Sequence, residues 1–216
     1  MDDNFKLSLQ DEKIISVTPV PEHFSLTWML GSRCNYDCMY CPTELHDSTS
    51  RPHDLETMQQ VWQNIYNKTQ HKNLPYKISF TGGEVTANKN FLPLIQWLKN
   101  TYPDVEMILL TTNGSASQQY YKKLASLVTS ISFSTHSEYM DEEKFFDTVL
   151  AIDRIMVRPT KSVHVNIMNE HWNQDRIKLY QQWLDKHNIS YSINQIDYAP
   201  ATRTYILDKG KKNLAI

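Results

Sequence analysis

The stretch Cys34-Asn35-Tyr36-Asp37-Cys38-Met39-Tyr40-Cys41 decides how this chain of 216 residues is interpreted, because it holds all three cysteines of the protein. The spacing is CxxxCxxC, and thiolates are the preferred ligands of soft metals and iron–sulfur clusters. A four-iron cluster normally takes four thiolates, whereas this loop supplies three. The pattern therefore predicts a cluster held by one loop, with one iron open to another ligand.

A structural zinc site is the alternative that the cysteines leave open. Either His46 or His53 would complete a Cys₃His set, which is a common arrangement for zinc. The usual zinc pattern has short cysteine knuckles in pairs, and this chain has no second knuckle. A disulfide is disfavoured because the number of cysteines is odd and nothing else suggests secretion.

Composition limits the class of protein. A chain of 216 residues suits one domain with a full hydrophobic core. The 22 basic and 24 acidic residues give a net charge of −2, whereas a general nucleic-acid binder usually carries a basic face. The sequence has no apolar run long enough to span a bilayer, and Met1-Asp2-Asp3-Asn4 lacks the basic and apolar regions of a signal peptide. We expect a cytoplasmic protein with no membrane or nucleic-acid partner.

Strands with a period of two alternate with helices along most of the chain. Strands are predicted over residues 24–30, 76–81, 106–112, 130–136, 162–168 and 189–195. Helices are predicted to begin near Asp54, Asn88, Ser117, Asp141 and Asn173. This order predicts an α/β fold with a parallel sheet and helical crossovers, although the alternation alone also allows a doubly wound sheet.

The chain divides into three predicted parts: an N-terminal extension over residues 1–23, one domain over residues 24–197, and a C-terminal tail over residues 198–216. Two short strands, 5–9 and 14–17, are predicted in the extension. The tail ends in a lysine-rich cluster, which is typical of a solvated end. If the domain is a barrel, its functional groups are expected on the loops at the C-terminal ends of the strands.

Two motifs together resemble the signature of the radical S-adenosylmethionine (SAM) superfamily. The first is CxxxCxxC with the aromatic Tyr40 just before the last cysteine, and the second is Gly82-Gly83-Glu84 at the end of the second predicted strand. The resemblance covers roughly residues 24–197 and implies an incomplete (β/α)6 radical SAM barrel with parallel strands. One departure is Val85, which stands where the family usually has proline.

The resemblance also implies the cofactors. Cys34, Cys38 and Cys41 would hold a [4Fe-4S] cluster, and S-adenosyl-L-methionine would bind the open iron. Electron transfer from the reduced cluster would split SAM and produce a 5′-deoxyadenosyl radical that abstracts a hydrogen atom from a substrate. An electron donor such as flavodoxin or ferredoxin is therefore an expected partner.

The family pattern further implies which residues bind SAM. Glu84 would hold its amino group, because a carboxylate accepts hydrogen bonds from an ammonium group, and Gly82 and Gly83 would let the backbone approach the ligand. The other implied contacts are Tyr40 near the adenine, Thr112 and Asn113 at the end of the third strand, and Ser134 and Asn166 at the ribose. Ordinary hydrogen bonding at strand ends is the alternative for these residues.

The alternation of side chains along the strands predicts a polar substrate. In five of the six strands one face is apolar and the other carries hydroxyl and amide groups. With helices outside a barrel, the polar face lines the interior, and short polar side chains cannot fill that space. We expect a small polar substrate, such as a nucleotide, nucleoside or sugar derivative, although these groups could instead satisfy one another through ordered water. The candidate substrate contacts are Ser132, His136, Glu138, His164 and Asn194, and no catalytic side chain is assigned.

The resulting interpretation is a minimal radical SAM enzyme. Because these 216 residues contain no further cysteines, we expect no cysteine-bound auxiliary cluster, and we expect no second domain that binds cobalamin. The cysteine stretch resembles most the general group that contains viperin and molybdenum-cofactor enzymes. The sequence leaves two alternatives open, a peptide- or protein-modifying radical SAM enzyme and a non-catalytic metal-binding module. We do not expect an activase of glycyl-radical enzymes, because no signature of one is present.

Overall fold

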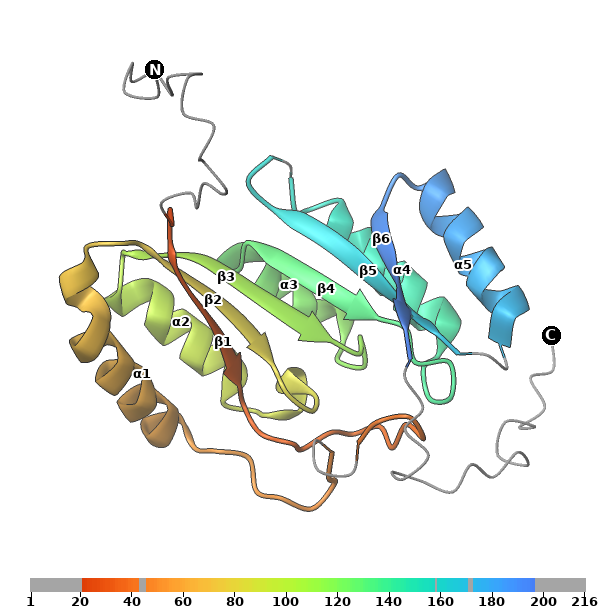
Figure 1. Cartoon of the computed structure of the whole chain (residues 1–216). Helices are drawn as coiled ribbons and strands as arrows, with labels where there is room; N and C mark the ends of the chain where they lie inside the picture. Colours follow the sequence, from red (N-terminus) through yellow and green to blue (C-terminus); the bar gives the residue numbers. More distant parts are fainter. Residues whose placement is uncertain (1–20, 43–45, 158, 171–172, 197–216) are drawn as a thin grey trace, which may run out of the picture.

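The computed structural model describes residues 21–42, 46–157, 159–170 and 173–196. Within them, one parallel sheet is ordered β1-β2-β3-β4-β5-β6, so that each strand pairs with its neighbours along the chain (Figure 1). The strands are β1 (Phe24–Met29), β2 (Tyr76–Thr81), β3 (Val105–Thr112), β4 (Ser130–Ser134), β5 (Ser162–Asn169) and β6 (Ser190–Gln195). The strands predicted over residues 5–9 and 14–17 and the tail over residues 198–216 lie outside the described residues.

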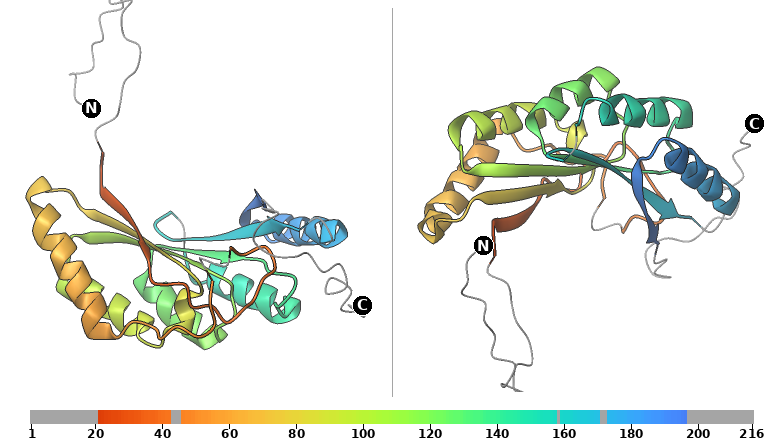
Figure 2. Two further views of the ribbon diagram at one scale, coloured as in Figure 1. Left: turned by 60° about the horizontal axis from the view of Figure 1, so that its bottom comes forward. Right: turned by 90° about the horizontal axis from the view of Figure 1, so that it is seen from above.

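The helices lie together on one side of the curved sheet (Figure 2). They are α1 (Leu55–Thr69), α2 (Phe91–Thr101), α3 (Gln118–Leu127), α4 (Glu142–Asp153) and α5 (Gln174–Lys186), with two short 3₁₀ turns, η2 (Gln70–Lys72) and η3 (Val85–Ala87). A doubly wound sheet would carry helices on both faces. The sequential strand order and the single helical layer instead confirm the predicted incomplete (β/α)6 barrel.

Most helix starts agree with the predicted capping residues. Asp54, Ser117 and Asp141 each accept a hydrogen bond from the backbone N–H three residues further on, as an N-cap does. The predicted start at Asn88 is wrong by three residues. The Asn88 side chain accepts a hydrogen bond from the Asn90 N–H at 2.9 Å and forms a turn after η3, so α2 begins only afterwards.

The core lies between the sheet and the helices. Ile78 and Phe80 of β2 and Ile131 and Phe133 of β4 are buried there, while the intervening residues of these strands face the other side of the sheet. The predicted apolar face of the last strand is only partly confirmed, because Ile193 is 46% exposed. At the edge of the sheet β6 has a strand on one side only, so its outer half is less well covered.

The loops that follow the strands meet at one edge of the sheet, because all six strands are parallel. The long loop between β1 and α1 runs along this edge, below the arrowheads of the strands in Figure 1. It carries the three cysteines. Among the described residues, no helix has the length and apolar character that crossing a membrane requires.

Candidate functional site

The three cysteines line one cavity of about 310 Å³ at the C-terminal edge of the sheet. The loop after β2 contributes Gly82, Gly83 and Glu84 to this cavity, and Tyr40 comes from the cysteine loop itself. The ends of β3 and β4 add further predicted residues, which are Thr112, Asn113, Ser134 and His136. Motifs that lie far apart in the sequence are thus brought together, as the family pattern predicts.

The two glycines allow the loops after β1 and β2 to lie directly against each other. The Gly83 N–H donates to the Gly31 carbonyl at 2.9 Å, and the Glu84 N–H donates to the Arg33 carbonyl at 2.8 Å. Gly82 has φ of +134°, and a Cβ there would lie 2.5 Å from the Gly31 carbonyl oxygen. A Cβ on Gly83 would overlap the carbonyl oxygen of Arg33. The glycines therefore allow two backbone segments to approach each other, and their expected approach to a ligand stays a prediction.

Glu84 is held as a buried carboxylate, 4% exposed. Its Oε1 accepts hydrogen bonds from the Thr86 N–H at 2.9 Å, the Thr86 hydroxyl at 2.6 Å and the Thr112 hydroxyl at 2.7 Å. Its Oε2 accepts one from the Asn113 N–H at 2.6 Å. Burial raises the pKa of Glu84, and these four donors oppose that effect because they stabilise the charged form.

Thr112 lines the cavity and also contacts the buried carboxylate. Its hydroxyl bonds Glu84 Oε1 and lies 2.8 Å from the Tyr121 hydroxyl, so the side chain turns toward the helical layer. Thr112 therefore positions the carboxylate.

Val85, the residue that departs from the family pattern, is 2% exposed and begins η3. That first helical position suits proline but does not require it, so the departure leaves Glu84 in place.

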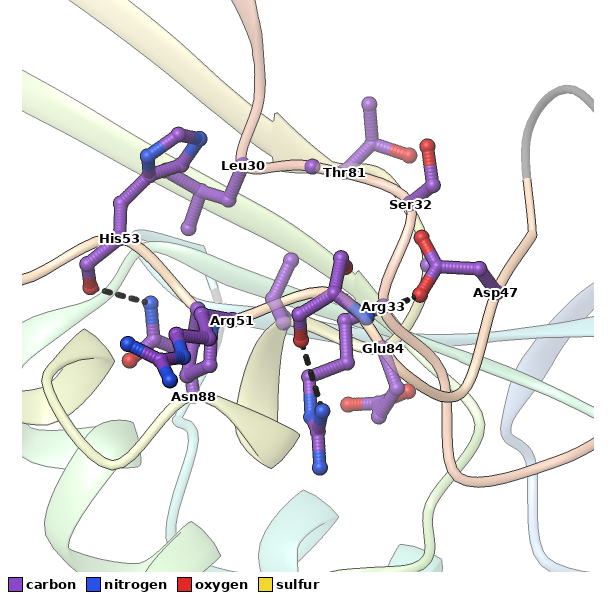
Figure 3. A pocket seen from close by; sticks show the side chains of 14 residues that line it. Leu30, Ser32, Arg33, Asp47, Arg51, His53, Thr81, Glu84 and Asn88 are labelled. Atoms are coloured by element: carbon purple, nitrogen blue, oxygen red, sulfur yellow. Dashed lines mark hydrogen bonds between the residues drawn. The ribbon is translucent and has the colours of Figure 1, made fainter.

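A second cavity of about 240 Å³ lies beside the same loop (Figure 3). Arg33, Arg51, His53 and Asn88 line it, and Gly83 and Glu84 line both cavities. The His53 carbonyl accepts a hydrogen bond from the Asn88 side chain at 3.2 Å (Figure 3). His53 is therefore not among the residues that surround the cysteines.

His46 does line the cysteine cavity, but each of its ring nitrogens lies near an oxygen of the same loop. Its Nε2 is hydrogen-bonded to the Tyr36 carbonyl, and its Nδ1 lies 3.7 Å from Asp37 Oδ1. A zinc ion needs its ligands about 2 Å from a single point. In the part of the chain that the structure describes, no three His, Cys, Asp or Glu side chains converge in that way. A cluster differs, because its cysteines bind separate irons and lie further apart.

The loop after β4 is attached to the cysteine loop by side chains. Glu138 Oε2 accepts a hydrogen bond from the Met39 N–H at 3.3 Å, and the Tyr139 hydroxyl donates to the Asp37 carbonyl at 2.8 Å. The rings of Tyr139 and Tyr36 stack with centroids 5.5 Å apart. Glu138, a candidate substrate contact, thus contacts the cysteine loop.

His136 lies beside the middle cysteine. Its Nδ1 is 3.4 Å from Cys38 Sγ and is also hydrogen-bonded to the Tyr40 hydroxyl. The rings of His136 and Tyr40 are stacked, with an interplanar angle of 9°. Burial lowers the pKa of His136 to about 4, so the ring is neutral near pH 7. Burial, together with Glu138, raises the pKa of the Cys38 thiol.

Asn113 joins the carboxylate to the first cysteine. Its backbone N–H bonds Glu84, and its side-chain Nδ2 donates to Asn35 Oδ1 at 3.0 Å. The same Nδ2 lies 4.0 Å from Cys34 Sγ. The Cys34 sulfur also accepts the Tyr36 N–H at 3.4 Å.

Three predicted residues lie outside the cavity, on the open face of β5 and β6. His164 contacts the Ser190 and Ser192 hydroxyls, each at 3.1 Å. The Ser192 hydroxyl also lies 3.2 Å from both Asn166 Oδ1 and Asn194 Oδ1. Asn166 does not line the cavity itself, but its Nδ2 donates to the hydroxyl of Ser134, a cavity-lining residue, at 3.3 Å. Ser132 is half-buried and pairs in register with His164.

Sequence reasoning missed several residues of this region. Tyr36 and Met168 line the cysteine cavity. The alternation of His164, Asn166 and Met168 on one face of β5 could have identified Met168.

Glu170, which sequence reasoning also missed, is 2% exposed and accepts hydrogen bonds from the Ser137 N–H and hydroxyl. Burial raises the pKa of Glu170 to about 7, and no motif pointed to it.

The described residues fit an iron–sulfur cluster together with a small ligand. Three thiols face one cavity from one loop, and a buried carboxylate that is already held by donors stands on the same wall. The fold and this cavity define a partial-barrel protein with a thiol-lined cavity at the C-terminal edge of its sheet.

Comparison with known proteins identifies the family. The model of the radical SAM superfamily matches residues 28–188. The chain therefore belongs to the radical SAM superfamily, whose members are enzymes that use a [4Fe-4S] cluster and SAM.

The similar proteins are longer than this chain. A GTP 3',8-cyclase of Clostridium perfringens is 26% identical over 178 residues, which is 78% of this chain and 51% of that protein. The molybdenum cofactor biosynthesis protein moc-5 of Caenorhabditis elegans is 30% identical over 127 residues, 57% of this chain and 20% of that protein. SuiB of Streptococcus suis, crystallised with S-adenosylmethionine, is similar in fold, with a TM-score of 0.61 at 12% identity over 83% of this chain and 42% of SuiB. This chain spans about half of the cyclase and less of the other two.

Proposed function

We propose that this chain holds a [4Fe-4S] cluster on Cys34, Cys38 and Cys41, binds SAM beside Glu84, and acts on a small polar molecule. One observation carries the proposal: the three thiols and the buried carboxylate line the same cavity at the C-terminal edge of the barrel. In this family the bound cluster and SAM together supply a radical that abstracts hydrogen. The residues of this chain bind and orient these groups.

Glu84 is suited to hold an ammonium group. Each carboxylate oxygen offers about two acceptor sites, and Oε1 already takes three donors from Thr86 and Thr112. Oε2 takes one, from the Asn113 N–H, and so retains capacity for a donor from the cavity. Because its position is set by these bonds, the carboxylate would need little reorganisation on binding SAM.

The open face of the sheet supports a polar substrate. His164, Asn166, Ser192 and Asn194 form a hydrogen-bonded group on this face, next to Ser134 on the cavity wall. The cyclase relative is named for a nucleotide, GTP, which agrees with a polar small molecule. The peptide-modifying alternative is favoured by one likeness, since SuiB was crystallised with the precursor peptide SuiA, but at 12% identity that likeness concerns the fold.

The first test concerns the cofactors. After anaerobic reconstitution with iron and sulfide, the protein should release 5′-deoxyadenosine when given SAM and a strong reductant, and reduced flavodoxin or ferredoxin should replace the chemical reductant. A protein that loads zinc and takes up no iron under these conditions would refute the proposal.

The second test concerns Glu84. Glu84→Gln should keep the cluster and bind SAM about 10- to 100-fold more weakly, because a charge-assisted bond contributes about 1.5–3 kcal/mol. The matched control is Thr112→Val, which removes one donor that positions the carboxylate but keeps its charge, and it should weaken SAM binding less. Full SAM affinity in Glu84→Gln would show that the assignment is wrong.

The third test concerns the substrate. SAM turnover should be stimulated by a nucleotide, nucleoside or sugar derivative in a screen of candidate metabolites. His164→Ala should reduce that stimulation while leaving cluster content unchanged. Stimulation by hydrophobic peptides or lipids alone would contradict the polar-substrate proposal.

A further inference from the structure

The three cysteines differ in their surroundings. Cys38 is the buried one, 5% exposed, whereas Cys34 and Cys41 are partly exposed. Cys34 Sγ accepts the Tyr36 backbone N–H at 3.4 Å and has one polar side chain, that of Asn113, at 4.0 Å. Cys38 Sγ is instead contacted by two polar side chains, one from its own loop and one from the loop after β4.

These two side chains are Tyr40 and His136. His136 Nδ1 lies 3.4 Å from Cys38 Sγ, and the Tyr40 hydroxyl is hydrogen-bonded both to His136 Nδ1 and to the Cys38 sulfur. The stacked rings of Tyr40 and His136, with centroids 6.0 Å apart, hold this arrangement. The tyrosine hydroxyl, the imidazole nitrogen and the sulfur therefore form one compact hydrogen-bonded group.

The donors in this group are determined by the state of the sulfur. A thiolate that binds iron can only accept hydrogen bonds. The Tyr40 O–H would then donate to Cys38 Sγ, and His136 would carry its proton on Nδ1 and donate it to the sulfur and the Tyr40 oxygen. Every hydrogen in the group has an acceptor in this arrangement, and neither side chain needs a charge.

We propose that Tyr40 and His136 are positioning residues that raise the reduction potential of the cluster by donating hydrogen bonds to Cys38. The inference rests on the proposed function, because it requires a cluster on the three cysteines. Hydrogen bonds to the sulfur ligands are among the factors that set the potential of such clusters. One-electron reduction adds negative charge that is shared with the cysteine sulfurs, and a donated hydrogen bond stabilises that charge.

The test is the midpoint potential of the reconstituted protein, measured by an anaerobic redox titration followed by electron paramagnetic resonance. Tyr40→Phe keeps the stacked ring and removes the hydroxyl, and His136→Leu removes the imidazole donor. Each change should lower the equilibrium constant for one-electron reduction about tenfold, which corresponds to a potential about 59 mV more negative. His136→Asn places an amide donor near the position of Nδ1 and should restore most of the loss.

The matched control is Tyr139→Phe. It removes the hydroxyl that donates to the Asp37 carbonyl at 2.8 Å, so it weakens the attachment of the same loop without removing a donor to sulfur. Its potential should equal that of the unmodified protein. A shift in Tyr139→Phe as large as in Tyr40→Phe would overturn the inference, because loosening of the loop would then explain both.

Cluster content separates this inference from the proposed function. If the unmodified protein assembles no cluster, the proposed function fails. If it assembles a cluster and Tyr40→Phe and His136→Leu have the potential of the unmodified protein, the proposed function stands and the hydrogen-bond inference fails. If His136→Leu does not retain a cluster, Tyr40→Phe decides the matter, since it preserves the ring packing.

Discussion

The cysteine loop and the open face of β5 and β6 both carry polar residues of the candidate site, but they are held in different ways. The loop after β1 is joined to the loop after β2 through backbone hydrogen bonds from Gly83 and Glu84, at 2.9 and 2.8 Å. On the open face, the backbone pairing lies within the sheet, between β5 and β6, and the polar groups such as His164 and Ser192 contact one another through their side chains, at 3.1 Å. A substitution in the first region disturbs the backbone that carries the three cysteines and Glu84, whereas one in the second removes a few side-chain contacts at the surface. If the proposed function is right, the open face can therefore vary without loss of the cysteine loop.

The largest effect is expected from Cys38→Ala. Two thiolates cannot hold a four-iron cluster firmly, so this change should abolish cluster assembly completely, as should Cys34→Ala or Cys41→Ala. Iron and sulfide content and the visible absorption spectrum after anaerobic reconstitution measure the result. Ser192→Ala on the open face is the control and should retain full iron content. A fully loaded Cys38→Ala protein would remove the distinction between the two regions.

Gly83→Ala should be the most damaging change that leaves all the thiols in place. The new Cβ would meet the Arg33 carbonyl oxygen, which belongs to backbone and cannot move aside, so the unfolding free energy should fall by about 3 kcal/mol or more. Gly31→Ala is the comparison. A Cβ on Gly31 would have no atom within 4 Å beyond its chain neighbours, so this change causes no steric overlap. Its φ of +115° is unfavourable for alanine, so the unfolding free energy should fall by about 1–2 kcal/mol. Chemical denaturation of the two variants measures the difference, and equal losses would argue against a steric cause.

Glu170 should make stability depend on pH. Its folded pKa of about 7 lies above the ordinary 4.5, so the folded state binds the proton more tightly. Stability should therefore decrease as the pH rises from about 4.5 to 7, by about 2–3 kcal/mol. Glu170→Gln should remove this decrease. Glu143→Gln, on the exposed first turn of α4, should retain it. Unfolding curves recorded between pH 5 and 8 test this, and parallel curves for all three proteins would contradict it.

The smallest effect is expected from His164→Ala. Its two hydrogen bonds lie at a partly exposed site, so the unfolding free energy should fall by about 1 kcal/mol or less. Val165→Ala changes the next residue, which is fully buried on the other face of β5, and should cost about 2 kcal/mol or more. Thermal unfolding of both variants provides the measurement. A larger loss from His164→Ala would mean that the open face contributes to stability as the core does.

The fold could be predicted largely because its signals are local. Alternation identified the two faces of β2 and β4, and capping residues marked the starts of α1, α3 and α4. The alternation rule was wrong at Ile193, because an edge strand is not covered as an interior strand is. The expected start of α2 was wrong because the Asn88 side chain makes a turn of its own.

The candidate site was predictable only in part. The cysteine motif and Glu84 were recognised from their spacing and their place at strand ends, and both line one cavity. The contact between His136 and Cys38 joins residues 98 positions apart, and no local pattern encodes it. The same holds for Glu170 and Ser137, 33 positions apart.

The sequence by itself determined the superfamily and the order of strands and helices, and it identified the three thiols and one carboxylate of the candidate site. These follow from residue type, spacing and short-range periodicity, which are properties of neighbouring residues. Only the tertiary structure decided that Gly82 and Gly83 serve the approach of one loop to another, that Thr112 positions Glu84, and that His136 turns toward Cys38. Each of these contacts joins residues of separate loops, which meet only because the parallel strands end at the same edge of the sheet. The directions of these side chains are set by packing and not by their spacing in the sequence.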